Sequence, residues 1–175
     1  MKLNRIFLTI FLCMTLLLSM LAMASCGGSD GQSEETRDPN KPAATLDSIY
    51  AAVTAVVPNA DKLTDAQESQ LGSFFNGAKP EDFASYKRVL QSMSTSIDEI
   101  GIFEAKTPED VKKIEEMIDG FFDLYNSLWN DDYLETEYPK LKNAERVTAG
   151  NFVMYVILDD DTRAAAITAF ENETK

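Results

Sequence analysis

The chain contains no histidine and only two cysteines, Cys13 and Cys26, among its 175 residues. The absence of histidine excludes Ser-His-Asp and Cys-His catalytic arrangements and the usual zinc sites. Both cysteines come early in the chain, so we expect no disulfide, cysteine nucleophile or thiolate metal site in the part that follows. We therefore expect no metal, no cofactor and no catalytic residue, and Ser-Lys or carboxylate chemistry is the only enzymatic option left.

Positive charge is also scarce. The chain has 16 Lys and Arg residues against 29 Asp and Glu residues, a formal net charge of −13 at pH 7. Proteins bind nucleic acids and anionic lipids largely through Lys and Arg, so we expect no nucleic-acid partner and no adhesion of the folded part to acidic lipid. The excess of acidic residues favours solubility instead.

The amino-terminal residues have the pattern of a secretory signal. Lys2 and Arg5 make a positive end, and no charged residue occurs from Ile6 to Met23. This pattern is typical of a segment that enters the membrane while its positive end stays in the cytoplasm. The alternative is an uncleaved membrane helix, because the apolar run approaches the roughly 18 residues that a spanning helix needs. We predict a signal peptide over residues 1–25.

The end of this segment, Leu21-Ala22-Met23-Ala24-Ser25-Cys26, resembles the lipobox of bacterial lipoproteins. The resemblance implies cleavage between Ser25 and Cys26 and attachment of a diacylglyceryl group, with acyl chains such as palmitate, to the Cys26 thiol. Met23 stands where leucine is more usual. Cys26 is thus the predicted lipid anchor, and two acyl chains would hold the protein on the cell membrane, facing outside the cytoplasm.

Residues 26–43 predict a flexible tether. They are rich in glycine, serine and acidic residues and contain almost nothing to bury, which is typical of a flexible chain with a reach of roughly 20 Å. The following residues, 44–172, number about 130, a length that buries one core and not two. We therefore predict a single, monomeric globular domain after the tether.

Two helices are predicted at the start of this domain. Thr45 caps a helix over residues 46–57, which has apolar residues on one stripe. A shorter helix over residues 64–71 begins at a capping box and ends at Gly72.

The longest predicted helix begins at Pro108, after the cap residue Thr107. Its buried stripe recurs at three- and four-residue spacing: Val111, Ile114, Ile118, Phe121, Phe122, Tyr125, Leu128 and Trp129. A last helix is capped by residues 159–162, and its predicted buried side consists of Ala166, Ile167 and Phe170. We expect the tail from Glu171 to fray.

Two β-hairpins are predicted from the apolar residues between these helices. The first pairs residues 86–93 with 98–106, and the second pairs residues 144–148 with 152–158. The segment 152–158 is apolar on both faces, as in a central strand. The fold class is therefore α+β, with an antiparallel sheet of about four strands, in two hairpins, packed with helices and preceded by one or two N-terminal helices. Phe103, Phe121 and Val156 are expected to meet in one core.

Two segments and the order hairpin, helix, hairpin, helix resemble an uncharacterised bacterial lipoprotein family, known as domain of unknown function 4358. The segments are Asp98-Glu99-Ile100-Gly101-Ile102-Phe103 and Gly150-Asn151-Phe152-Val153-Met154-Tyr155-Val156. The resemblance covers residues 45–170 and rests on apolar patterns more than on reactive residues. It implies a small extracytoplasmic lipoprotein and supplies no catalytic residue.

Two groups of residues are candidates for binding. The run Asp159-Asp160-Asp161 could hold a divalent cation, but its neighbours lack the spaced acids, central glycine and closing glutamate of a calcium loop. We expect it to cap a helix, so no metal site is assigned. Trp129, Tyr133 and Tyr138, with Asp131 and Asp132, could form a surface for wall glycans, although Trp129 also completes the apolar stripe of the long helix.

The leading hypothesis is a non-enzymatic, membrane-anchored module that binds an envelope protein or a cell-wall component. One alternative is an envelope enzyme that hydrolyses wall glycans with two carboxylates about 5 to 10 Å apart. The candidate carboxylates for that reaction are Glu99, Glu104, Asp131 and Asp132. A second alternative is an accessory solute-binding lipoprotein, which the short domain disfavours.

Overall fold

A computed structural model describes residues 43–91, 96–130 and 134–175. The elements are, in chain order, α2 (Leu46–Thr54), η1 (Ala60–Lys62), β1 (Thr64–Asp65), α3 (Glu68–Phe74), η2 (Pro80–Asp82), β2 (Ser85–Leu90), β3 (Glu99–Glu104), α4 (Pro108–Leu128), α5 (Tyr138–Lys142), β4 (Glu145–Ala149), β5 (Phe152–Ile157) and α6 (Asp160–Thr174). Ser25, Cys26 and the predicted tether up to residue 42 lie outside the described residues, as do Asp131, Asp132 and Tyr133.

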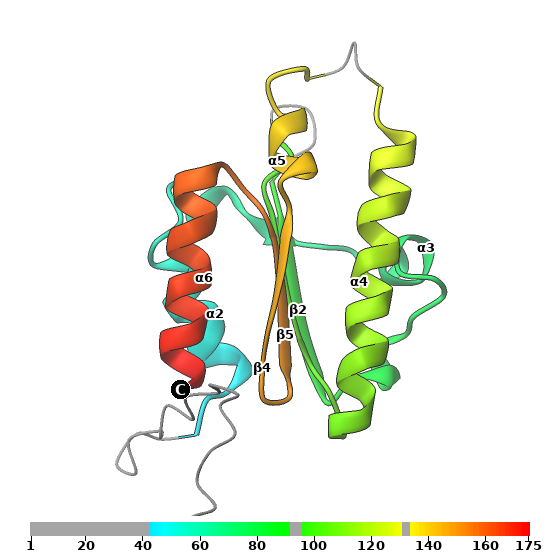
Figure 1. The fold of residues 1–175 in the computed structure, drawn as a ribbon, viewed down its shortest axis with the longest axis vertical. Helices are drawn as coiled ribbons and strands as arrows, with labels where there is room; N and C mark the ends of the chain where they lie inside the picture. Colours follow the sequence, from blue (N-terminus) through cyan, green and yellow to red (C-terminus); the bar gives the residue numbers. More distant parts are fainter. Residues whose placement is uncertain (1–42, 92–95, 131–133) are drawn as a thin grey trace, which may run out of the picture. The chain divides into compact units, whose positions relative to one another are not determined.

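The strands of the described residues form one antiparallel sheet in the order β1-β2-β3-β5-β4. The α+β class is confirmed, and so are both predicted hairpins, β2–β3 and β4–β5. The sheet has five strands rather than about four because Thr64 and Asp65 pair with Leu90 and Val89 as the short edge strand β1. Helices α2 and α6 cover one face of the sheet, and α3 and α4 lie on the other (Figure 1).

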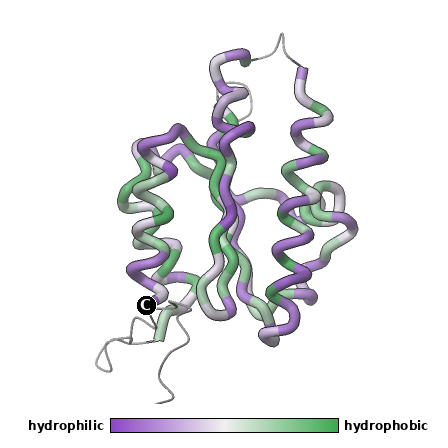
Figure 2. The backbone as a smooth tube through the Cα atoms, in the orientation of Figure 1, coloured by the Kyte–Doolittle hydropathy of each residue, from purple (hydrophilic) through white to green (hydrophobic). Residues whose placement is uncertain are grey.

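Each face of the sheet has its own apolar core, because successive residues of a strand point to opposite faces. In β3, Ile100 and Ile102 pack toward α2 and α6, whereas Phe103 packs toward α4. The central strand β5 is buried on both faces, as its sequence predicts. In Figure 2 the hydrophobic residues concentrate on the strands between the two helical layers.

The prediction that Phe103, Phe121 and Val156 meet in one core is correct for the two phenylalanines. Phe103 and Phe121 share the α4-side core, but Val156 lies in the core on the opposite face. Its neighbour Tyr155 takes that place, with ring centroids 6.2 Å from Phe103 and 5.4 Å from Phe121. Because strand alternation has a period of two, a shift by one residue exchanges the faces.

The starts of two predicted helices are confirmed. Helix α2 opens with a capping box in which the Ser48 N–H donates to Thr45 Oγ1 (3.1 Å) and the Thr45 N–H donates to Ser48 Oγ (3.0 Å). Helix α4 begins at Pro108 after the N-cap residue Thr107.

The helix expected at residues 64–71 is misplaced. Thr64 and Asp65 belong to β1, and α3 begins at Glu68, where Gln67 and Gln70 form the capping box. Gly72 lies inside α3 rather than at its end. The cap-like pattern at Thr64 is local, whereas its pairing with β2 is a long-range contact that overrides it.

Two predicted ends also differ from the structure. The tail after Glu171 does not fray, because α6 continues to Thr174, whose hydroxyl donates to the Phe170 carbonyl (2.8 Å). Leu128, predicted in the buried stripe of α4, is 64% exposed.

None of the helices in the described residues is long and apolar enough to cross a membrane.

Phe121 tests the α4-side core. Its side chain is 1% exposed and packs on Phe75, with ring centroids 4.5 Å apart. We expect Phe121→Ala to lower the free energy of unfolding by about 3 to 5 kcal/mol, because a large buried ring leaves a cavity. Lys112→Ala, on the exposed side of α4, should change it by less than about 0.5 kcal/mol. Urea unfolding of both variants is the measurement, and equal midpoints would contradict the assignment of the inner face.

Candidate functional site

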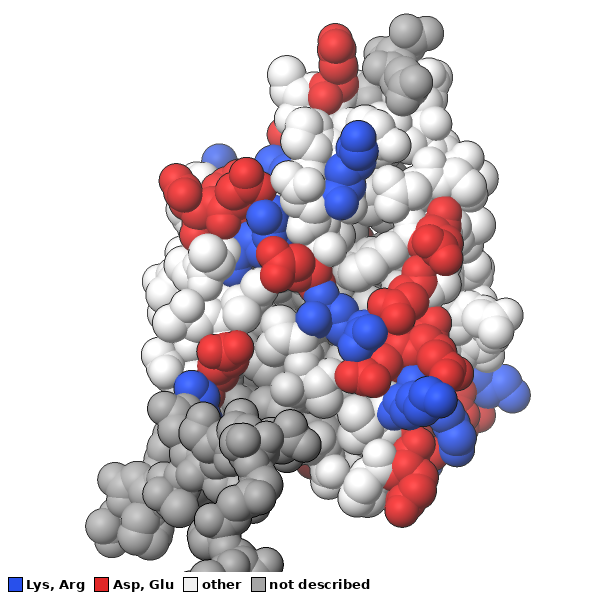
Figure 3. All heavy atoms as spheres, viewed as in Figure 1, with Lys and Arg blue, Asp and Glu red and all other residues white. Residues whose placement is uncertain are grey.

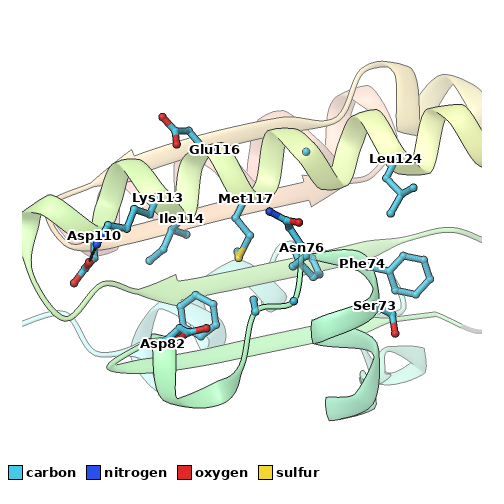
Figure 4. Close-up of a pocket in the computed structure, with 15 residues that line it drawn as sticks. Ser73, Phe74, Asn76, Asp82, Asp110, Lys113, Ile114, Glu116, Met117 and Leu124 are labelled. Carbon is cyan, nitrogen blue, oxygen red and sulfur yellow. Dashed lines mark hydrogen bonds and ion pairs between the residues drawn. The ribbon is translucent and has the colours of Figure 1, made fainter.

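A groove of about 760 Å³ lies between α4 and the chain that leaves α3 (Figure 4). Its lining combines apolar side chains with a few charged ones: Ser73, Phe74, Phe75, Asn76, Gly77, Ala78, Asp82, Phe83, Asp110, Lys113, Ile114, Glu116, Met117, Gly120 and Leu124. The groove is open to solvent along one side of α4.

One wall of the groove is a second stripe of α4. Met117, Gly120 and Leu124 recur at three- and four-residue spacing and lie beside the stripe that packs on the sheet. Met117 and Leu124 are half-buried, and in Figure 4 Met117 points from the helix into the hollow. Helix α4 thus contributes one stripe to the core and a neighbouring one to the groove.

The opposite wall is a reversal of the chain after α3. Asn76 and Gly77 have positive φ angles of 52° and 80°, and the Gly77 N–H donates to the Gly72 carbonyl (2.8 Å). Positive φ is readily adopted by glycine and tolerated by asparagine, so this pair lets the chain turn back sharply. The turn places Ala78 and Asp82 across from α4.

The floor of the groove is aromatic. Phe74 and Phe75 line it and pack on Phe121, with ring centroids at 6.3 and 4.5 Å. Behind these rings lies the guanidinium of Arg88, with its Cζ 5.8 Å from the Phe74 centroid and 5.2 Å from that of Phe75. At these distances the ring faces attract the cation, so Arg88 holds the floor in place from below.

Arg88 belongs to a buried polar cluster with Glu99 and Tyr155. The Arg88 Nε–H donates to Glu99 Oε1 (2.5 Å) and Tyr155 Oη (3.0 Å), and the Tyr155 hydroxyl donates to the same Glu99 oxygen. Arg88 is 7% exposed and Glu99 is 4% exposed. Arg88 Nη1 is buried and has no hydrogen-bond partner in the described structure. A charge pair this deep requires mutual hydrogen bonds to offset the loss of hydration.

The pKa values agree with this pairing. Burial opposes the charge on the guanidinium, but Tyr155 and Glu99 outweigh it, so the pKa of Arg88 lies above its ordinary value. Burial, and next the Glu99 carboxylate, raise the pKa of Tyr155 well above 10. Tyr155 is therefore a neutral hydrogen-bond donor, and Arg88 is a cation, at any physiological pH.

Gly101 makes the cluster possible. The register aligns Arg88 of β2 with Gly101 of β3, and Gly101 with Tyr155 of β5, so these three residues form a row across the sheet. A Cβ atom at Gly101 would lie 2.1 Å from Cε1 of the Tyr155 ring. The ring therefore lies over the bare backbone of β3, and its hydroxyl reaches the same glutamate as Arg88 does.

The charged lining residues of the groove are mainly acidic. There are three carboxylates, Asp82, Asp110 and Glu116, and one cation, Lys113. The Lys113 Nζ lies 2.7 Å from Asp110 Oδ1. The hydrogen bond from Lys113, followed by that from Thr107, lowers the pKa of Asp110, so it stays ionised. Acidic side chains gather on the part of the surface where α4 lies (Figure 3).

Glu99 and Glu104, the two candidate carboxylates in the described residues, are not arranged for glycan hydrolysis. Glu99 is paired with Arg88, whereas Glu104 accepts a hydrogen bond from the Ser85 hydroxyl (2.5 Å). They are five positions apart on β3, so they point to opposite faces and their Cα atoms are about 16 Å apart. Asp131 and Asp132, the other two candidates, lie outside the described residues.

Two of the three aromatic residues proposed for glycans, Trp129 and Tyr138, pack on one another. The rings of Trp129 and Tyr138 stack with centroids 5.3 Å apart and an interplanar angle of 11°, so each covers a face of the other. Tyr133 falls outside the described part of the chain.

Asp159 caps α6 as predicted, because its Oδ1 accepts the Thr162 N–H (3.1 Å), and Asp160 pairs with Arg163 (2.9 Å).

The groove and the Arg88 cluster were not predicted from the sequence. Two weak signals were available: a basic residue at Arg88 amid a predicted strand, and Gly101 in the middle of a buried one, which often marks a close approach of another group. Neither signal identifies the partner side chains.

Comparison with known proteins gives one match. A family model described as "Domain of unknown function (DUF4358)" matches residues 52–158. No curated protein and no solved structure matches the chain.

The charge pair predicts an asymmetry between single and double substitutions. We expect Arg88→Met to cost about 3 to 5 kcal/mol of unfolding free energy, because it leaves the Glu99 carboxylate buried without its cation. Arg88→Met combined with Glu99→Gln should cost markedly less, because the glutamine oxygen still accepts from Tyr155 and no charge remains. Thermal and urea unfolding at neutral pH measure both. A double variant less stable than the single one would contradict this account of the cluster.

Proposed function

We propose that this chain, which belongs to the DUF4358 family, is a lipid-anchored extracytoplasmic module that binds a partner through the groove beside α4. The family description names no activity, so the proposal is drawn from the amino-terminal sequence and from the geometry of the groove.

The anchor is supported by the sequence alone. A positive end, an uncharged apolar run and the small residues Ala24 and Ser25 precede Cys26, which is the order of features in a lipoprotein signal. A diacylglyceryl group on Cys26 would keep the module at the membrane, and residues 26–43 would give it freedom to meet a partner.

The observation that carries the binding role is the groove itself. About half of the residues that line this open hollow of about 760 Å³ are apolar, and its volume is within the range of ligand sites. Met117 in its wall is a flexible side chain of the kind that adapts to different partners. The floor of Phe74 and Phe75, packed against the Arg88 guanidinium, supplies an aromatic surface for a partner. Binding rather than catalysis is the use that these groups support best.

The anchor is tested by Cys26→Ala. We expect wild-type protein to incorporate an alkyne-labelled fatty acid and to sediment with membranes, whereas the variant loses both the label and the membrane association. Labelling of wild type and variant to the same extent would contradict the lipid-anchor proposal, and so would a variant that remains on the membrane.

The groove is tested by photocrosslinking in intact cells. A benzophenone amino acid at Met117 should give a crosslinked adduct, because this side chain points into the hollow. The matched control is the same amino acid at Ala164, which is exposed on α6 across the sheet. Equal yields at both positions, or none at Met117, would contradict the groove as the binding surface.

A further inference from the structure

Gly120 is an unusual residue for its position. It is exposed in the middle of α4, a helix of 21 residues, where glycine is among the least favourable residues. A Cβ atom built at Gly120 would have nothing within 4 Å beyond its own helix, and its φ is not positive. The described fold therefore does not require glycine at this position.

The lack of a side chain at Gly120 does, however, shape the groove. Gly120 lies between Met117 and Leu124 on the wall stripe, and it leaves a notch between two apolar side chains. Small residues at such notches let the backbones of two helices approach closely. The apolar surface continues along the same side of α4 to Leu128, which is 64% exposed. A helix crossing α4 at Gly120 would cover this surface.

The charges around the groove restrict the partner further. The lining contains three carboxylates, Asp82, Asp110 and Glu116, and one lysine, Lys113, which is bound to Asp110. Glu116 is paired with Lys112, whose Nζ lies 3.6 Å from Glu116 Oε1. Glu116 points to the outer side of α4, away from the hollow (Figure 4), so Asp82 and Asp110 are the carboxylates on the side of the hollow. A partner with basic side chains beside its apolar face would complement this rim, and an acidic partner or an anionic lipid would be repelled.

We infer that the groove accepts an amphipathic, basic helix of a partner protein, which crosses α4 at Gly120. The stripe from Asp110 to Leu124 is about 21 Å long at 1.5 Å per residue, so it matches a helix of about four turns. The apolar face of the partner contacts Met117 and Leu124, and its Lys or Arg residues lie beside Asp82 and Asp110. This inference rests on the proposed function, since it names the class of partner for the same groove.

The probe is a fluorescent 14-residue peptide with leucine at helical spacing and lysine elsewhere. It is titrated against the lipidated chain in phosphatidylcholine nanodiscs, with empty nanodiscs as the blank, and fluorescence anisotropy is measured. We expect saturable binding that weakens as salt increases. A peptide with the same leucines and glutamate in place of lysine should bind at least tenfold more weakly. Equal binding of the two peptides would overturn the charge argument.

A size series at residue 120 tests the crossing point. We expect Gly120→Ala to weaken binding of the lysine peptide and Gly120→Leu to weaken it at least tenfold. Both variants should melt at or above the temperature of the wild type, because alanine and leucine favour helix more than glycine does. Binding and stability thus change in opposite directions, which a general disturbance of the fold would not produce. Unchanged binding by Gly120→Leu would overturn the proposal.

Ala164→Leu provides the matched control, because it adds the same side chain at an exposed position of α6 on the other face of the sheet. It should leave binding within about twofold, and a loss equal to that of Gly120→Leu would also overturn the proposal. If the Met117 crosslink in cells captures glycan rather than protein, the binding role stands and the helical partner is wrong. If Cys26 carries no lipid, the anchor fails, and the same peptide titration with the unlipidated chain in solution still tests the groove.

Discussion

The buried charge pair between Arg88 and Glu99 is the constraint on which the rest of the structure depends. It connects β2 to β3, and through the Tyr155 hydroxyl it reaches β5, so three adjacent strands share one polar centre. Such a pair adds little net stability, because removing two charges from water offsets their attraction. Its effect is on specificity: a strand shifted by one residue would bury Arg88 against the opposite apolar core, away from its carboxylate.

The same pair links the sheet to the groove. Three phenylalanine rings surround the guanidinium of Arg88, namely Phe74, Phe75 and Phe121. Two of these rings come from the end of α3 and one from α4, so the cation lies where the two walls of the groove meet the sheet. The charge pair of the sheet is therefore in direct contact with the aromatic rings under the groove.

Local patterns in the sequence were sufficient for the elements that are locally determined. Thr107 and Pro108 identified the start of α4, and alternating apolar residues identified both hairpins. Contacts between residues far apart in the sequence could not be predicted from it. Examples are the pairing of Thr64 with Leu90, the hydrogen bond between Arg88 and Tyr155, and the groove between α3 and α4. Glu99 was named as a candidate reactive carboxylate, whereas the structure pairs it with Arg88 of another strand. The sequence does not show which distant charges meet.

The row of Arg88, Gly101 and Tyr155 has a consequence for how related chains can diverge. Any side chain at residue 101 would collide with the tyrosine ring, and a smaller residue at 155 would take away a donor from Glu99. These positions can therefore change only together, and single-step drift at the centre of the sheet is blocked. Met117, Gly120 and Leu124 take no part in this row, so a change at any of them leaves the row intact. The outer surface of α4 can thus vary while the centre of the sheet stays unaltered.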